Sequence, residues 1–486
     1  MKEYAAKQPS PWVSVLPLAV LTLLLYVVIR CFGGDAINGG SQIALLSATS
    51  VCVMLAIGIY RCKWAVLEEA IIDNIRASAS AIIILLLIGA IAGSWMVSGV
   101  VPTMIYYGLK ILHPSFFLVA SCVSCAGVSL MTGSSWTTIA TIGVALMGTG
   151  QAMGFPEGWI AGAIISGAYF GDKLSLLSDT TVLASSTVGV PIFTHIRYML
   201  YTTVPSFVIA LAVFVIAGLT LDHTGGTHAG MYAESLRGTF RITPWLLAVP
   251  VATGVLIVRK LPAIVTLFCA AVFACIAMLL AQPELVAKVA GVGGLDFMSG
   301  FKGVLMSCFG PTAIPTGSPQ LDELVATRGM AGMLNTVWLI ICAMCFGGVM
   351  TGSGMLGALT SVFLRFVRRA FSAVASTVGA GIFFNLCTAD QYISIILSGR
   401  LFRELYAERG LEPRLLSRSV EDSATVCSVL VPWNSCGMTQ ATVLGVSTFV
   451  YMPYCIFNIV SPLMSLMVAA IGWKIKRAAG TAAHPH

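Results

Sequence analysis

The sequence GDKLSLLSDTT, from Gly171 to Thr181, places three charged side chains inside an otherwise apolar part of the chain. They are Asp172, Lys173 and Asp179. At the centre of a bilayer an ionised side chain costs about 2.5–3.5 kcal/mol, so three that faced lipid would oppose insertion by roughly 8–10 kcal/mol. These side chains must therefore face protein, water or an ion, and the stretch is a candidate functional site.

The composition of the 486-residue chain is typical of a polytopic membrane protein. Hydrophobic residues make up 57% and charged residues only 10%, and the mean hydropathy is +0.92. Soluble domains carry about 25% charged residues. The net charge of +7 comes from bases that cluster in short loops, which indicates membrane topology and not a nucleic-acid partner. We therefore expect a multi-pass protein of the cell (inner) membrane, in contact with the lipid bilayer.

The ends of the chain carry the signals for orientation. Lys2 and Lys7 precede an apolar run, 12–29, that is too long for a signal peptide, so we expect a retained first span. Lys474 and Lys476 follow the last apolar run. The positive-inside rule then places both termini on the cytoplasmic side.

The apolar and polar segments predict an all-α chain with five regions. The N-terminal spans and an amphipathic interfacial helix at Trp64–Arg76 occupy 1–80, and a first transport repeat occupies 81–220. Connecting spans and a loop cover 221–335, a second transport repeat covers 336–475, and a cytoplasmic tail covers 476–486. The Gly- and Pro-rich segment 282–328 has no clear assignment from its pattern.

The two transport repeats are indicated by matches at one shared offset. Thr132 and Thr388 are 256 residues apart (388 − 132), as are Gly189 and Gly445 (445 − 189). This register sets polar positions of one half opposite polar positions of the other: Ser134 and Asp390, Ser178 and Asn434, Asp179 and Ser435. Transporters are commonly built from repeats whose interrupted helices meet near the midplane. We therefore expect the polar breaks of the two halves to meet.

The residue types at these breaks suit a hard cation. Carboxylate, hydroxyl, amide and freed carbonyl oxygens are hard ligands, and unwound backbone is tolerated in a membrane only where it is buried or lines a cavity. Asp172, Ser175 and Asp179 have spacings of three and four, which places them on one face of an unbroken helix. Burial beside a like charge makes a carboxylate hold a proton more tightly. Asp172 and Asp179 are thus expected to bind Na⁺ and H⁺ in alternation.

Three further charged residues are candidates for charge partners or gating groups. Lys173 is expected to pair with Asp172 or Asp390 when no cation is bound; the alternative is an Asp172–Lys173 ion pair that only fixes packing. Glu421 and Asp422 either take part in the site or begin an interfacial helix, where acidic residues favour the N-terminal end. His195 is expected at the interface.

Four motifs resemble the NhaC-type sodium/proton antiporter family of the ion-transporter superfamily. They are GAYFGDKLSLLSDTT at 167–181, TGSSWTT at 132–138, SRSVEDSATVCSVLVPWNSCG at 417–437 and LGVSTFVYMPY at 444–454. The resemblance implies two inverted repeats, each with a re-entrant hairpin and a broken helix, and a homodimer with elevator-type movement. It places the hairpin tips at 134–135 and 389–390 and the helix openings at 178–179 and 434–435. The chain departs from the family pattern at Leu176 and Val182, where the family usually has proline and asparagine.

The sequence thus predicts exchange of Na⁺ for H⁺, with no cofactor besides the transported ions. The candidate ion- or substrate-binding residues are Thr132, Ser134, Ser135, Asp172, Ser175, Ser178, Asp179, Thr180, Asp390, Asn434 and Ser435. The alternative is a Na⁺- or H⁺-coupled carrier or exchanger of a small organic acid, of the malate/lactate type, or of an amino acid. Arg197 or half-helix N-termini would then bind the substrate carboxylate. The chain has no HExxH, GxSxG or Walker A sequence, so no enzyme activity is expected.

Overall fold

The computed structural model describes residues 9–32, 38–221, 227–259, 261–294, 296–316, 322, 325–365, 367 and 369–475. The described residues are almost entirely helical, and the one β-type pairing among them is an isolated bridge between Thr312 and Thr327. The predicted tail at 476–486, Lys2 and Lys7 lie outside the described residues. The predicted all-α fold class is confirmed.

Many of these helices are long and apolar enough to cross a membrane. Eight qualify among the described residues, or up to 11 if three pairs bent by more than 40° each count as one span. Large apolar side chains such as Leu23, Met54, Ile216 and Phe268 are exposed on the outer helices. A surface of this kind matches a hydrocarbon solvent. The chain is therefore a multi-span membrane protein.

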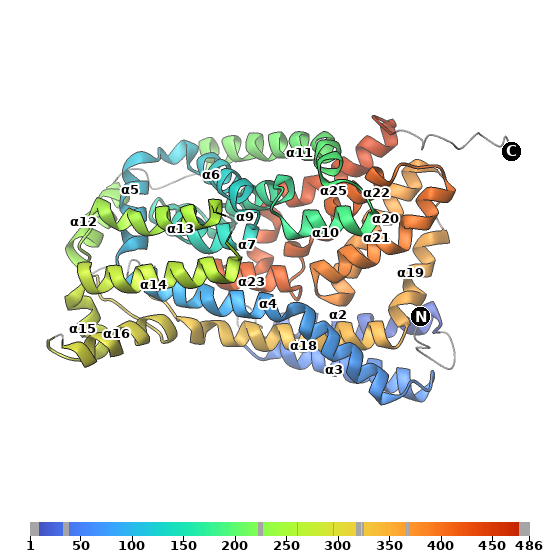
Figure 1. The fold of residues 1–486 in the computed structure, drawn as a ribbon, viewed down its shortest axis with the longest axis horizontal. Coiled ribbons are helices and arrows are strands. Elements are labelled where there is room, and N and C mark those ends of the chain that lie inside the picture. The colour runs from blue at the N-terminus through green and yellow to red at the C-terminus, as the bar shows by residue number, and fades with distance from the viewer. Residues whose placement is uncertain are drawn as a thin grey trace.

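The N-terminal region forms the outer layer on one side of the molecule. Its helices are α1 (Pro11–Ser14), α2 (Leu16–Phe32), α3 (Gly40–Gly58) and α4 (Trp64–Val97). The predicted interfacial segment Trp64–Arg76 is not a helix of its own, because it is the first part of the 34-residue helix α4. Its position at the membrane interface stays a prediction. No proline or glycine interrupts the chain between Trp64 and Ile88, so nothing ends the helix there. Figure 1 shows α4 beside α18 along one side of the molecule, with α2 and α3 next to them.

The first predicted repeat contains a turn between two helices and a helix that breaks. Its elements are α5 (Val100–Ile111), η2 (Pro114–Phe116), α6 (Phe117–Thr132), α7 (Ser135–Thr138), the π-helical turn η3 (Ile139–Gly143), α8 (Val144–Ala152), α9 (Glu157–Leu174), α10 (Asp179–Val188) and α11 (Ile192–Thr220). Helices α9 and α10 meet at an angle of 46°.

The connecting region includes helices in the segment that the sequence left without an assignment. Its elements are α12 (Thr227–Thr239), η4 (Pro244–Leu247), α13 (Ala248–Val258), α14 (Ala263–Ala281), α15 (Pro283–Ala290), α16 (Phe297–Phe309) and η5 (Met330–Met333). Helix α15 packs against α16, and both lie at the end of the molecule farthest from the two termini (Figure 1).

The second predicted repeat has the same kinds of feature in the same order. Its elements are α18 (Leu334–Gly352), α19 (Met355–Arg365), α20 (Ala370–Thr388), α21 (Gln391–Glu408), α22 (Pro413–Val420), the π-helical turn η6 (Glu421–Thr425), η7 (Ser428–Leu430), α23 (Ser435–Leu444), α24 (Thr448–Tyr451), η8 (Met452–Tyr454) and α25 (Ile456–Ile471).

Local backbone geometry recurs at the predicted offset of 256 residues. Gly133 after α6 and Ala389 after α20 both have a positive φ, of 66° and 56°. Each is followed by a side chain that caps the next helix, Ser134 or Asp390. These matches agree with the sequence register. The repeat boundaries and the inversion of the repeats stay predictions.

Close packing of α6 on α9 brings the two predicted motifs of the first half together. A Cβ atom built on Gly167 would lie 2.0 Å from the Cys122 carbonyl oxygen, and one on Gly171 would lie 2.3 Å from the Ala126 carbonyl oxygen. Only glycine allows backbones to approach this closely, as in the small-residue interfaces of membrane helices. The spacing of these two glycines therefore fixes the C-terminal end of α9 against the end of α6.

Candidate functional site

The centre of the site is the break between α9 and α10, at Ser175–Ser178. The Ser175 hydroxyl accepts a hydrogen bond from the Leu177 N–H at 3.2 Å, and the Ser178 hydroxyl accepts one from the Thr181 N–H at 3.4 Å. Serine favours such local bonds over helix continuation, and here it ends one helix and caps the next. The break thus forms with Leu176, which is exposed, in place of the proline that the family pattern has.

Asp172 lies in the last turn of α9 and faces the turn between α6 and α7. Its Oδ2 atom accepts hydrogen bonds from the Ser135 N–H at 3.1 Å and from the Ser135 hydroxyl at 2.7 Å. The Asp172 side chain is buried, and Ser178 lies beside it. The structure therefore brings together a buried carboxylate, the predicted tip and the helix break, which are the parts that a cation site needs.

Hydroxyl groups at the tip hold the turn in shape. The Thr132 hydroxyl accepts a hydrogen bond from the Ser134 N–H at 3.1 Å, and the Ser134 side chain caps α7 by accepting from the Thr137 N–H at 3.2 Å. Thr180 pairs with Ser178 in a similar way, with 3.0 Å between their hydroxyl oxygens. These residues position the backbone of the site.

The expectation that Asp179 is buried beside Asp172 is wrong. Asp179 is exposed, whereas Thr180 and Thr181 next to it are buried. Asp179 is the first residue of α10 and directly follows the break. It still acts electrostatically on Asp172.

The corresponding turn in the second half carries its carboxylate at the tip. Asp390 is buried and caps α21 by accepting from the Ile393 N–H at 3.0 Å. Its other oxygen accepts from the Ser435 hydroxyl at 3.3 Å, and the Ser435 N–H donates to the Ala389 carbonyl at 2.8 Å. Asn434 caps α23 by accepting from the Cys436 N–H at 3.0 Å. Tip and break are therefore in contact in this half as well.

Tyr392 of α21, which sequence reasoning did not select, lies within electrostatic range of acidic residues from both halves. Helix α10 packs against α21. Asp172, Asp179 and Asp390 all act electrostatically on the Tyr392 hydroxyl group. The available signal was its position two residues after Asp390 in the same polar interruption.

The partner predicted for Lys173 is wrong, since its amino group pairs with Asp422 and not with Asp172 or Asp390. The Lys173 amino group also donates to the Ser461 hydroxyl at 3.1 Å, and both side chains of the ion pair are buried. The two partners are 249 residues apart in the chain, so no local spacing could have indicated the pair.

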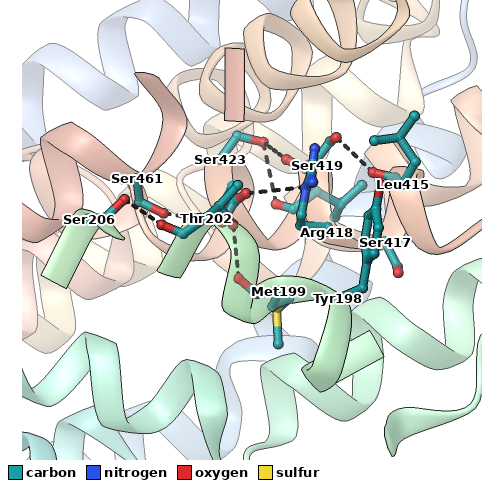
Figure 2. A network of polar contacts seen from close by, with 12 residues as sticks. Tyr198, Met199, Thr202, Ser206, Leu415, Ser417, Arg418, Ser419, Ser423 and Ser461 are labelled. Carbon is teal, nitrogen blue, oxygen red and sulfur yellow. Dashed lines mark hydrogen bonds and ion pairs between the residues drawn. The ribbon is translucent and has the colours of Figure 1, made fainter. Parts of the chain in front are cut away.

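The alternative of an interfacial helix start at Glu421 and Asp422 is also wrong. Both side chains are fully buried in η6, as is Arg418 one turn earlier. Figure 2 shows Arg418 and Ser417 of α22 facing Tyr198 and Thr202 of α11, in a network that reaches Ser461 of α25. His195, expected at the interface, is likewise buried and lies 2.8 Å from the Ser417 hydroxyl.

Comparison with known proteins matches residues 167–473 to the family model described as the Na⁺/H⁺ antiporter family. The match covers more than half of the chain and includes the α9–α10 break, Asp390, the Glu421–Asp422 pair and the α23 cap. The chain belongs to the Na⁺/H⁺ antiporter family.

Relatives of this antiporter-family chain are similar over most of their length. The Na⁺/H⁺ antiporter NhaC of Alkalihalophilus pseudofirmus is 35% identical over 87% of this chain and 89% of its own. The Na⁺/H⁺ antiporter NhaC of Bacillus subtilis is 33% identical over 84% of this chain and 87% of its own. The malate-2H⁺/Na⁺-lactate antiporter of Bacillus subtilis is 34% identical over 89% of both chains. These relatives are transporters, in agreement with the expected class.

The side-chain groups around the break carry oxygen atoms that could hold a cation. Among the described residues no group of three or more His, Cys, Asp and Glu side chains could hold a metal ion. Asp172 and the hydroxyls of Ser135 and Ser178 are hard oxygen ligands next to unwound backbone.

Proposed function

We propose that this protein exchanges Na⁺ for H⁺ across the membrane as a secondary active transporter. The observation that supports this most directly is the buried Asp172 carboxylate, held 2.7 Å from the Ser135 hydroxyl at a helix break. A buried carboxylate in a membrane protein needs nearby positive charge or a proton, and a bound cation can supply positive charge at this helix break. Membership of the Na⁺/H⁺ antiporter family agrees with this function.

In this proposal the cation binds between the tip and the break. The Asp172 carboxylate supplies the negative charge, and Ser135 and Ser178 supply hydroxyl oxygens. Asp179, exposed at the start of α10, raises the local concentration of cations at the opening. Asp390 and Ser435 close the site from the second half.

The test is transport by the purified protein in vesicles, with a pH-sensitive dye inside. An imposed Na⁺ gradient should drive proton movement in the wild type, and D172N should lose it by about a hundredfold, because removing a charged ligand from a buried site costs several kcal/mol. The matched control is D73N, which removes the same group from an exposed i,i+3 ion pair with Arg76 and should transport like the wild type. Absence of Na⁺-driven proton movement in the wild type would reject the function.

A second candidate function is coupled exchange of a small organic acid, favoured by the similarity to the malate-2H⁺/Na⁺-lactate antiporter. The structure does not support Arg197 as its carboxylate-binding residue, since this side chain is exposed on α11. Dose-dependent thermal stabilisation by malate or lactate, with none by Na⁺ alone, would favour this function over Na⁺/H⁺ exchange.

The location and assembly follow from the same proposal. We place the protein in the inner membrane with both termini in the cytoplasm, because the basic loops fit the positive-inside rule. We also propose a homodimer and no bound cofactor. Labelling of terminal tags from outside the cell tests the orientation, and the mass of the detergent-solubilised protein tests the dimer.

A further inference from the structure

A second group of buried charges lies beyond the site around Asp172. Lys173 reaches it from α9, Arg418 comes from α22, and Glu421 and Asp422 come from η6. None of the four side chains is more than 1% exposed. The proposed Na⁺ site uses none of them, so their chemistry needs a separate account.

Three of these side chains form ion pairs, because Lys173 and Arg418 both lie next to Asp422. Asp422 Oδ1 binds the Lys173 amino group and accepts hydrogen bonds from Ser461 at 3.2 Å and Thr202 at 3.3 Å. Arg418 Nε lies 3.9 Å from Asp422 Oδ2, and the guanidinium covers the Tyr198 ring at 4.8 Å (Figure 2). Asp422 is thus shared between two cationic side chains.

Glu421 has no such partner. Neither of its carboxylate oxygens accepts a hydrogen bond from the described part of the chain. An isolated ionised carboxylate in a buried site is so costly that the group takes up a proton instead. The absence of a hydrogen-bond partner among the described residues therefore favours the protonated form of Glu421.

The surroundings of Glu421 contain few other groups that could titrate with it. The helices α20 and α25, which pack against η6, carry no charged residue among their described parts. Charged residues of α21 such as Arg400 and Glu404 are exposed, and so is Asp179 at the start of α10. The groups that do act on Glu421 are Lys173, Asp172, Asp422 and the Thr425 side chain. His195 of α11 interacts electrostatically with Lys173 and Asp422.

The charges around Glu421 balance without it. Lys173 and Arg418 carry two positive charges, and Asp172 and Asp422 carry two negative ones. A cation at Asp172 adds one positive charge to this set, and loss of the proton from Glu421 restores the balance. Because both events occur in a buried environment, each favours the other strongly.

We propose that Glu421 is the proton-binding carboxylate of the exchange reaction, separate from the Na⁺-binding carboxylate Asp172 and coupled to it by charge. The proposal rests on the Na⁺/H⁺ exchange proposed above. Binding of Na⁺ at Asp172 releases the Glu421 proton, and release of Na⁺ allows Glu421 to take up a proton again. The π-helical turn that begins at Glu421 fits this role, since such turns recur at functional sites.

The experiment compares two transport modes in vesicles for the wild type, E421Q and D172N. Exchange of ²²Na⁺ for Na⁺ needs no proton, and Na⁺-driven proton movement does. E421Q should keep Na⁺/Na⁺ exchange within about threefold and lose proton movement by about tenfold or more, a typical size for the coupling between two sites. D172N should lose both modes.

The matched control is E284Q. Glu284 lies on α15 and forms an exposed ion pair with Arg241, so the substitution removes the same kind of charge and should keep both transport modes. Full proton movement in E421Q overturns the proposal. Loss of both modes in an E421Q protein that melts like the wild type also overturns it, because Glu421 would then belong to the cation site. No proton movement in the wild type would instead reject the exchange function itself.

If the E421Q protein does not fold, a second measurement on the wild type and E421D tests the proposal. Addition of Na⁺ to the unbuffered protein in detergent should release protons from the wild type. In E421D the shorter carboxylate has different neighbours, so the pH midpoint of this release should shift. A midpoint that stays at the wild-type value overturns the proposal.

Discussion

The two halves of the molecule share a backbone frame but distribute their charged groups differently. In the first half, Ser135 at the tip donates to Asp172 before the break. The equivalent positions in the second half, 256 residues later, are Gln391 and Ser428, and they are also in contact, with 3.4 Å between Ser428 Oγ and Gln391 Oε1. The same contact is thus charged in one half and neutral in the other.

A second pair of equivalent positions differs in the opposite sense. Asp390 at the tip of the second half accepts a hydrogen bond from Ser435 at the start of α23. In the first half the equivalent of Asp390 is Ser134, which caps α7, and the equivalent of Ser435 is Asp179, which is exposed. The frame therefore specifies where tip and break meet, and the side chains decide which half presents a carboxylate to the centre. We expect the first half to bind the cation and the second half to complete its surroundings.

The largest effect should come from the tip residue that is glycine in one half and alanine in the other. In G133A, the new Cβ atom would lie 2.5 Å from the Leu177 carbonyl carbon, at a φ of 66°. The tip must then move away from Asp172, and a shift of this kind lowers transport by about a hundredfold. Transport in vesicles measures the loss of activity, and thermal melting measures the effect of the substitution on stability.

The matched variant is A389G, at the position where a side chain is already present with a φ of 56°. Its transport should be unchanged, and its stability should change by less than about 1 kcal/mol, because relief of backbone strain offsets the entropy of glycine. Equal transport by G133A and A389G would contradict the difference between the tips.

A smaller effect is expected from the hydroxyls of the two equivalent contacts. S135A removes the 2.7 Å hydrogen bond to Asp172 and should weaken Na⁺ binding about tenfold, since hydrogen bonds to charged groups contribute about 1.5–3 kcal/mol. S428A removes a neutral contact and should stay within about fivefold of the wild type. Titration of Na⁺-dependent thermal stabilisation gives both affinities. A larger loss in S428A would place the cation in the second half.

The smallest effect on transport should come from substitution of Asp296, which lies outside both repeats. This substitution tests whether residues outside the repeats take part in transport. Hydrogen bonds from the Ser299 side chain and backbone hold the pKa of Asp296 below its usual range. A lowered pKa in the folded protein stabilises it above the usual value of about 3.9, and the contribution is lost as the pH falls. D296A should therefore melt below the wild type at pH 7 and approach it near pH 3, with transport unchanged. A transport defect would extend the site into α16.

The sequence predicted the framework well because its signals are local. Hydropathy identifies the spans, and the interruptions SLLS at 175–178 and PWN at 432–434 coincide with the ends of helices. The common offset of 256 residues indicated the shared geometry of Gly133 and Ala389. These features depend on the residues next to them in the chain, and so they could be predicted without knowledge of the tertiary packing.

The errors concern the side chains whose partners are distant in the chain. Asp179 was expected to be buried, but its place as the first residue of α10 depends on where the break ends, and the side chain points outward. The pairing of Lys173 with Asp422 follows from the packing of α9 on α25 and α11, which no spacing encodes. Arg418 had one local signal, its position four residues before Asp422 in the same motif.

Asp172 and Lys173 are neighbours in the chain, yet they are held by different partners. One is bonded to Ser135 of the preceding turn, and the other to Asp422 near the C-terminal end of the sequence. Across the break itself, the Thr181 hydroxyl donates to the Lys173 carbonyl at 3.2 Å and ties the two half-helices together. Any displacement that slid α9 past these anchors would expose a buried charge. During a transport cycle these parts should therefore travel as a single rigid block, with the conformational change confined to its outer boundary.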